Sequence, residues 1–347
     1  MRPERRPVTG PSVVVLGGTG FLGRRIGAAC AADGARVHLV SRAAPASAAA
    51  PGVSAVGLDL VTASPRAIAE LFAAARADVV VNAAGRAWQA DEAQMTAGNA
   101  ELVERVLTAL AELPGPPVRL VQLGTVHEYG AGAPDAATAE DHEPAPVTPY
   151  GRTKLRGTRA VLRARGVDGV VLRLANVIGA GVPRGSLFGR VAAHLGEAAR
   201  ADARGEKAAE LRLPALRAAR DLVDADDVTA AVLAAATAPT ADVAGQVINV
   251  GRGTAVPMRA LVDRMIELSG LELPVAEEAE RSGSRTDVPW QCLDISRARR
   301  LLGWTPLRSL DDSLRDLLAS VLPPEHPRPG TPLGITADAP AEEGKRP

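Results

Sequence analysis

The chain has 347 residues, a formal net charge of +0, 46% hydrophobic residues and 23% charged residues. This composition suits a globular protein with a sizeable core, and the balanced charge gives no reason to expect nucleic acid as a partner. No apolar run is long enough to cross a membrane, and no signal-type stretch is present. Two cysteines and five scattered histidines provide neither a disulfide framework nor a metal site. We therefore expect a soluble cytoplasmic protein with no metal, no nucleic acid and no membrane contact.

The first half of the chain alternates β-branched runs with alanine-rich helical patterns, which is typical of βαβ units. The predicted strands cover residues 13–16, 36–40, 53–58, 78–82, 118–123 and 169–174. The predicted helices cover residues 21–33, 65–76, 92–113 and 148–165. Continuous apolar strands suit a sheet that helices cover on both faces. The predicted fold class is therefore α/β, with a doubly wound parallel sheet.

After Asn176 the alternation weakens, and we expect a smaller C-terminal lobe built from separated segments. Further helices are predicted near residues 187–199, 224–236, 256–270, 295–302 and 310–322, and a strand at 246–250. The predicted division is a flexible N-terminus (1–10), a main domain (11–178, with returning segments at about 219–252), a lobe (179–218 and 253–322) and a tail (323–347). The tail is rich in proline and polar residues, which predicts disorder.

A glycine-rich segment, GGTGFLG, directly follows the first strand and opens a helix. Glycines permit a tight turn and a close approach of the backbone to a pyrophosphate, and the helix N-terminus offers unpaired amides. The segment therefore predicts a dinucleotide site. The residues predicted to bind the dinucleotide here are Gly17, Thr19, Gly20, Phe21, Leu22 and Gly23.

The end of the second strand bears on the choice between NAD and NADP. An acidic residue there would bind the ribose 2′-hydroxyl, but the chain has Ser41 and Arg42, which suit a 2′-phosphate. These two residues favour NADP(H), although NAD(H) is possible. The alternative interpretation is that Arg42 is an ordinary solvated loop residue. Asp59 and Leu60 follow the third strand and can flank the adenine. The small residues Ala83, Ala84 and Gly85 follow the fourth strand, where a dinucleotide would cross the strand ends.

Tyr150 and Lys154 stand four residues apart on a predicted helix and so share one face. The chain has two tyrosines and three lysines, which makes a chance pair at this spacing rare. A lysine ammonium near the phenol lowers its pKa, and the phenol can then exchange a proton with a carbonyl oxygen during hydride transfer. Lys154 can also bind the nicotinamide ribose. We expect these two residues to be catalytic.

Two further polar residues are candidates for the same site. Thr125 follows the fifth strand, where its hydroxyl can orient a substrate carbonyl or simply cap the strand end. Asn99, in the long helix, can anchor a water that links Lys154 to solvent, or can be an ordinary helix-surface amide.

These residues and several later strings resemble the extended short-chain dehydrogenase/reductase family, in its NAD(P)-dependent sugar epimerase/dehydratase group. The resemblance runs from Val13 to about Leu322 and includes GGTGFLG, NAAG, YGRTK, RLANVIG, RDLVDADDV, NVG and ARRLLGW. It implies a Rossmann domain and a C-terminal lobe that binds a nucleoside-diphosphate sugar. It further implies that Asn176 contacts the sugar or its phosphates, and that Arg285 meets the diphosphate, with Arg281 close by as an alternative.

Within this group the dehydratases carry an Asp-Glu pair directly after the Ser/Thr, where this chain has Val126 and His127. The string from Gly124 to Gly130 looks instead like that of the 4-ketoreductases of deoxysugar pathways in natural-product gene clusters. This resemblance implies a role in antibiotic biosynthesis. We expect an NADPH-dependent 4-ketoreductase of a dTDP-4-keto-6-deoxyhexose, with His127 either a sugar contact or a solvated loop residue. The alternatives are an NAD-dependent nucleotide-sugar epimerase and a non-catalytic dinucleotide-binding protein. Fold analogy predicts a homodimer through the helices at 92–113 and 148–165.

Overall fold

The computed structural model describes residues 10–43, 52–87, 90–278, 288–324 and 326. The predicted flexible N-terminus and disordered tail lie outside the described residues, apart from Gly10, Pro323, Pro324 and His326. Arg281 and Arg285 also lie outside them.

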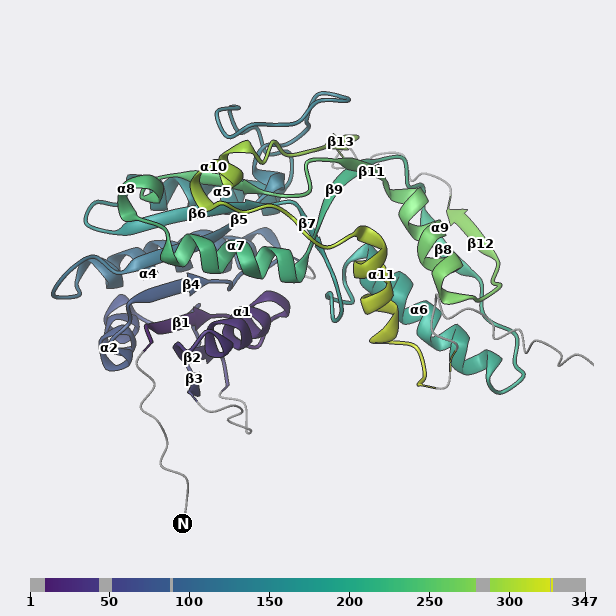
Figure 1. The fold of residues 1–347 in the computed structure, drawn as a ribbon, viewed down its shortest axis with the longest axis horizontal. Coiled ribbons are helices and arrows are strands. Elements are labelled where there is room, and N and C mark those ends of the chain that lie inside the picture. The colour runs from purple at the N-terminus through teal and green to yellow at the C-terminus, as the bar shows by residue number, and fades with distance from the viewer. Residues whose placement is uncertain (1–9, 44–51, 88–89, 279–287, 325, 327–347) are drawn as a thin grey trace, which may run out of the picture.

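A seven-stranded parallel sheet forms the centre of the larger part of the molecule (Figure 1). Its strands are β1 (Ser12–Leu16), β2 (Arg36–Ser41), β3 (Val53–Gly57), β4 (Val79–Asn82), β5 (Arg119–Thr125), β6 (Asp168–Leu174) and β10 (Val247–Val250). They lie in the order β3-β2-β1-β4-β5-β6-β10, and each neighbouring pair is parallel. The first six follow the strand order of a Rossmann fold, so the predicted fold class is confirmed.

Helices cover both faces of this sheet because successive strand residues point to opposite sides. In β1, Val13 and Val15 pack in one core with α1 (Phe21–Ala32), α7 (Ala225–Thr237) and α10 (Ser296–Leu302). Val14 and Leu16 pack in a second core with α2 (Pro65–Ala75), α4 (Leu102–Ala111) and α5 (Pro149–Arg163). Burial on both sides accounts for the continuous apolar strands in the sequence. α8 (Thr240–Val243) is a short helix between α7 and β10.

The long helix predicted at 92–113 is not a single α-helix. It consists of α3 (Glu92–Thr96), a π-helical turn η1 (Ala97–Glu101) and α4. The wider turn places Asn99 in the interior, where its side chain bonds to the backbone of Arg86. Turns of this kind occur inside α-helices and are frequent at functional sites.

The remaining elements build a smaller part of the molecule with its own core (Figure 1). They are β7 (Asn176–Ile178), α6 (Leu187–Asp202), β8 (Leu211–Pro214), β9 (Ala219–Asp224), β11 (Ala255–Pro257), α9 (Met258–Ser269), β12 (Val275–Glu278), β13 (Trp290–Gln291) and α11 (Leu310–Ala319). The predicted helices are present, but the short strands were not predicted. β9 pairs with β7, β11 and β13, and β12 pairs with β8. None of the helices within the described residues is long and apolar enough to span a bilayer.

Candidate active site

The glycine-rich loop lies between β1 and α1 and packs directly on the ends of neighbouring strands. Gly17 has a φ of 77°, and a Cβ there would lie 2.9 Å from the Ala84 backbone. The amides of Gly17 and Gly18 donate to the Val40 carbonyl at 3.0 and 2.9 Å. A Cβ at Gly23 would lie 2.1 Å from the Gly17 oxygen, so this glycine lets the helix approach the loop. The loop is therefore a close-packed cradle that admits glycine at these positions.

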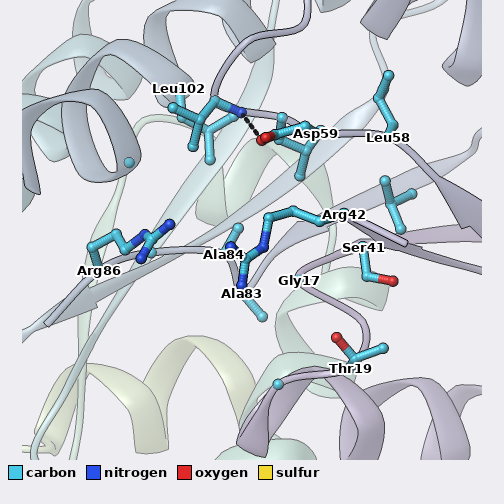
Figure 2. Close-up of a pocket in the computed structure, with 16 residues that line it drawn as sticks. Gly17, Thr19, Ser41, Arg42, Leu58, Asp59, Ala83, Ala84, Arg86 and Leu102 are labelled. Atoms are coloured by element: carbon cyan, nitrogen blue, oxygen red, sulfur yellow. Dashed lines mark hydrogen bonds between the residues drawn. The ribbon is translucent and has the colours of Figure 1, made fainter. Parts of the chain in front are cut away.

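A pocket of about 310 Å³ opens beside this loop (Figure 2). Ten of the residues predicted to bind the dinucleotide line it: Gly17, Thr19, Gly20, Ser41, Arg42, Asp59, Leu60, Ala83, Ala84 and Gly85. These residues come from the carboxyl ends of β1, β2, β3 and β4, where open α/β sheets bind their ligands. The glycine cradle and the pocket fit a dinucleotide, with its phosphates at the N-terminus of α1.

Three of the residues predicted to bind the dinucleotide, Phe21, Leu22 and Gly23, do not line the pocket. The Phe21 ring lies 4.9 Å from the Arg25 guanidinium and packs against the core of the smaller part. Leu22 packs against the core of the sheet face that α1 covers. Gly23 makes the close contact with Gly17 described above. The side chains of Phe21 and Leu22 therefore pack α1 against the two cores. Their predicted contact with the dinucleotide stays a prediction.

The polar residues that line the pocket at the ends of β2 and β3 differ in the hydrogen bonds that their side chains make. The Ser41 hydroxyl donates to the Ala43 carbonyl at 2.7 Å. The Asp59 carboxylate accepts the amide of Val61 at 3.0 Å and so shapes its own loop. Arg42 is exposed, and Figure 2 shows it and Arg86 extending into the pocket from two sides. The pocket therefore presents two guanidinium groups to an anionic ligand.

Sequence reasoning missed six residues that line the pocket: Val40, Leu58, Val61, Arg86, Gly98 and Leu102. Arg86 directly follows the NAAG string, which could have indicated it. Gly98 and Leu102 approach through the π-helical turn, and nothing in the sequence indicates that turn.

Tyr150 and Lys154 lie in the first two turns of α5, as the spacing predicted. The Thr148 side chain caps this helix by accepting the Gly151 amide at 3.0 Å, and Pro149 occupies its first turn. Gly151 has no side chain, which lets α5 approach η2, the 3-10 turn at Val126–Glu128. A Cβ at this position would lie only 2.3 Å from the His127 carbonyl oxygen. Local capping and this close packing hold Tyr150 beside the end of β5.

Burial shifts the pKa of both members of the pair. Burial raises the pKa of Tyr150 to about 12, opposed by a hydrogen bond with the Thr125 side chain and assisted by the charge of Glu128. Lys154 is buried and donates to the Leu123 carbonyl, and burial lowers its pKa although Glu128 acts to raise it. Lys154 is not among the causes of this shift, so the lowering of the Tyr150 pKa by Lys154 stays a prediction. The phenol is protonated at neutral pH and can donate a proton.

Thr125 and His127 both lie against Tyr150. The Thr125 side chain shares the hydrogen bond with the phenol, and its hydroxyl accepts the His127 amide at 3.4 Å. The His127 ring stands edge-on to the Tyr150 ring, with centroids 5.8 Å apart and an interplanar angle of 68°. The structure thus brings together the predicted catalytic hydroxyl and the predicted sugar contact around one phenol.

Asn99 is 2% exposed, so the helix-surface alternative is wrong. Its side chain accepts the Arg86 amide and donates to the Arg86 carbonyl, both at 2.8 Å. It also donates to the Thr153 hydroxyl at 3.1 Å, which in turn donates to the Tyr150 carbonyl at 3.0 Å. Asn99 therefore connects the segment after β4 to the first turn of α5. Its predicted role through a water stays a prediction.

The predicted substrate residues beyond β6 are only partly described. Asn176 begins β7 and is half-buried, and its side chain donates to the Asp221 carbonyl at 3.2 Å. Arg285 belongs to the segment outside the described residues. Across the described ranges, no group of three or more histidine, cysteine, aspartate or glutamate residues is placed to hold a metal ion.

The chain belongs to the NAD dependent epimerase/dehydratase family, whose family model matches residues 13–251. The expected family resemblance and the expectation of an NAD(P)-dependent enzyme are thereby confirmed.

Particular relatives refine this class. The chain is 45% identical over 315 residues to the dTDP-6-deoxy-L-talose 4-dehydrogenase (NAD(P)(+)) of Kitasatospora kifunensis, covering 90% of this chain and 96% of that protein. Its fold is similar to that of MoeE5 in complex with UDP-glucuronic acid and NAD, with a TM-score of 0.75, 24% identity and coverage of 89% and 98%. It is also similar to RMD from Pseudomonas aeruginosa complexed with NADPH, with a TM-score of 0.70, 23% identity and coverage of 89% and 99%.

Proposed function

We propose that this protein is an NADPH-dependent reductase of the 4-keto group of a dTDP-4-keto-6-deoxyhexose. The observation that carries the proposal is the placement of Tyr150 at the start of α5, where it is hydrogen-bonded with the Thr125 side chain at the end of β5 and shares a helix with Lys154. A protonated phenol at this place suits a reaction that needs a proton donor at a carbonyl oxygen.

In the proposed reaction, NADPH held beside the glycine-rich loop would supply a hydride to C4 of the sugar. Tyr150 gives its proton to the oxygen on C4, so the carbonyl becomes a secondary alcohol. Thr125 orients the carbonyl by a hydrogen bond from its hydroxyl. Lys154 would hold the nicotinamide ribose. The resulting phenolate regains its proton from solvent before the next turnover.

The proposed preference for NADPH over NADH rests on the residues that line the pocket at the ends of β2 and β3. Arg42 extends into the pocket from the end of β2, where an enzyme specific for NAD would carry a carboxylate. Asp59, the carboxylate that lines the pocket, already accepts a backbone amide. A guanidinium is the best side-chain partner for a phosphate, which supports NADPH. The name of the Kitasatospora relative gives both oxidised dinucleotides, so NADH is the second cosubstrate to test.

The substrate class is supported by the same relative, whose name gives a dTDP-linked 6-deoxyhexose oxidised at C4. Reduction of a 4-keto-6-deoxyhexose is the reverse of that reaction, which makes dTDP-6-deoxy-L-talose the first product to look for. Dehydration of the sugar is disfavoured, because Val126 replaces the acid next to the threonine and the carboxylate of Glu128 is paired with Arg173 at 2.8 Å.

The experiment is incubation of the purified protein with a dTDP-4-keto-6-deoxyhexose and NADPH or NADH. The proposal expects loss of the reduced dinucleotide, faster with NADPH, together with an equal amount of dTDP-6-deoxyhexose. Conversion of one nucleotide sugar to another with no loss of NADPH would favour the epimerase instead. Dinucleotide binding without any turnover would favour a non-catalytic role.

A further inference from the structure

A buried carboxylate directly beneath Thr125 has no role in the reaction described above. Glu128 ends the η2 turn and is 0% exposed. Its Oε1 atom accepts the Thr125 amide at 3.0 Å, while the Thr125 hydroxyl accepts the His127 amide. These two bonds form a capping box, which fixes the main chain of Thr125 where β5 ends and η2 begins. A Cβ at Gly124 would lie 2.7 Å from Oε1, so the carboxylate packs closely against the end of β5.

The charge of Glu128 is balanced from β6. The Arg173 Nε donates to the second carboxylate oxygen at 2.8 Å, and the two side chains are 4% and 0% exposed. The Arg173 guanidinium stacks over the Tyr129 ring at 4.4 Å, and the Tyr129 hydroxyl donates to Asn249 at 2.9 Å. These partners leave Glu128 little freedom to move.

A buried ion pair is costly to desolvate, and apolar residues of similar size are often as stabilising. Stability alone is therefore a weak reason for placing this pair beneath the active site. Arg173 on β6 bonds directly to Glu128. The charge of Glu128 also acts on Lys154 and Tyr150, which both lie on α5. The carboxylate thus lies within electrostatic reach of both members of the catalytic pair.

We propose that Glu128 is a positioning residue for the reduction, which holds Thr125 in place at the end of β5 and sets a fixed negative charge beside the catalytic pair. The inference rests on the proposed function for its effect on turnover, but its effect on Tyr150 is a property of the protein without any sugar. Arg173 confines the carboxylate to this position.

The test is Glu128→Gln, which keeps an oxygen for the Thr125 amide and removes the charge. The double variant Glu128→Gln/Arg173→Gln avoids leaving a buried arginine unpaired. The first readout is the ultraviolet absorbance of the Tyr150 phenolate as the pH rises in the ligand-free protein, with the Tyr129 signal subtracted by means of Tyr150→Phe. The second is kcat for reduction together with the Kd for NADPH.

A matched control lies on the same two strands. Arg119 and Asp168 form another buried ion pair between β5 and β6, with side chains 7% and 8% exposed, at the strand ends opposite Thr125. Asp168→Asn should lower the Tm without moving the Tyr150 titration. Glu128→Gln should move that titration to lower pH, and both Glu128 variants should lower kcat about 10- to 100-fold, with the Kd for NADPH unchanged.

The proposal is overturned if Glu128→Gln loses Tm as Asp168→Asn does while the Tyr150 titration stays in place. It is overturned equally if neither variant folds, because Glu128 would then be a residue required for folding. A wild-type protein that does not reduce the keto sugar would contradict the proposed function, but the Tyr150 titration would still decide the role of Glu128.

Discussion

The ring of His127 stands edge-on to the ring of Tyr150, with centroids 5.8 Å apart. The contact holds the phenol from the side of the η2 turn, while Thr125 bonds to its oxygen. It gives His127 a role against Tyr150 that the sequence did not predict, besides the predicted sugar contact.

Two substitutions separate these roles of His127. His127→Phe keeps an aromatic edge against Tyr150 and removes the ring nitrogens, whereas His127→Ala removes both. If the edge contact is what matters, we expect His127→Phe to keep most of kcat and His127→Ala to lose about 10-fold or more. Steady-state kinetics with the keto sugar measures this. A large rise in KM for both variants, with kcat unchanged, would favour the sugar contact.

Removing the phenol oxygen should stop the reaction. Tyr150→Phe should lower kcat by about 100- to 10,000-fold, the usual contribution of a positioned proton donor. NADPH binding should change little, because the pocket beside the glycine loop does not include Tyr150. Fluorescence titration of NADPH with the variant checks this second point. Loss of binding with retained turnover would contradict the assignment of Tyr150.

The raised pKa of Tyr150 predicts opposite pH dependences for the two directions of the reaction. With a pKa of about 12, the phenol carries its proton through the neutral and mildly alkaline range. Reduction should therefore be level over that range, whereas oxidation of the alcohol needs the phenolate and should speed up as the pH rises. Initial rates in both directions measure this. A reduction rate that declines steadily from neutral pH upward would contradict the raised pKa of this phenol.

The same pKa has a consequence for stability. A tyrosine whose pKa is raised on folding, from about 10 to about 12, contributes stability that is lost as the pH rises through this range. Tyr150→Phe should therefore lose less stability than the wild type does between neutral and strongly alkaline pH. Thermal unfolding at a series of pH values compares the two. Parallel curves would contradict the prediction.

Arg42 should determine the preference for NADPH. Arg42→Ala should raise the Kd for NADPH roughly 10-fold or more, because a hydrogen bond to a charged group contributes about 1.5–3 kcal/mol. The Kd for NADH should stay close to that of the wild type, which is the internal control. Equal weakening of both dinucleotides would mean that Arg42 binds a group they share, and the preference would then lie elsewhere.

The glycine cradle offers a comparison between two substitutions of the same kind. Gly17 and Gly34 both have positive φ, 77° and 87°, so alanine strains the backbone at either position. A Cβ at Gly17 would meet the Ala84 backbone, whereas nothing lies within 4 Å at Gly34. Gly17→Ala should abolish NADPH binding, and Gly34→Ala should cost about 1 kcal/mol of stability with binding intact. Calorimetry and thermal unfolding measure the two effects, and equal binding by both variants would contradict the role of the loop.

The elements of the main sheet were predictable because their signals are local. Val13 to Leu16 form an apolar run that a glycine turn ends, and Pro65 follows the Ser64 cap of its helix. The spacing of Tyr150 and Lys154 needed nothing beyond the regular geometry of one helix. These features depend on residues that are close in the sequence.

The features that could not be predicted depend on contacts between distant segments. The π-helical turn goes with the bonds of Asn99 to Arg86 and Thr153, 13 and 54 residues away. The Glu128–Arg173 pair joins residues that are 45 apart, inside strings that look like an ordinary loop and an ordinary strand. The raised pKa of Tyr150 follows from burial, which spacing alone does not reveal. For these features the tertiary structure was needed.

The measurement that tests the central claim most directly follows the hydride itself. The protein is incubated with a dTDP-4-keto-6-deoxyhexose and NADPH carrying two deuterium atoms at C4 of the nicotinamide, and the product is examined by nuclear magnetic resonance and mass spectrometry. The account predicts one deuterium at C4 of the product sugar for each NADPH consumed, and none with Tyr150→Phe. A sugar product without deuterium, formed while NADPH is left intact, would contradict it.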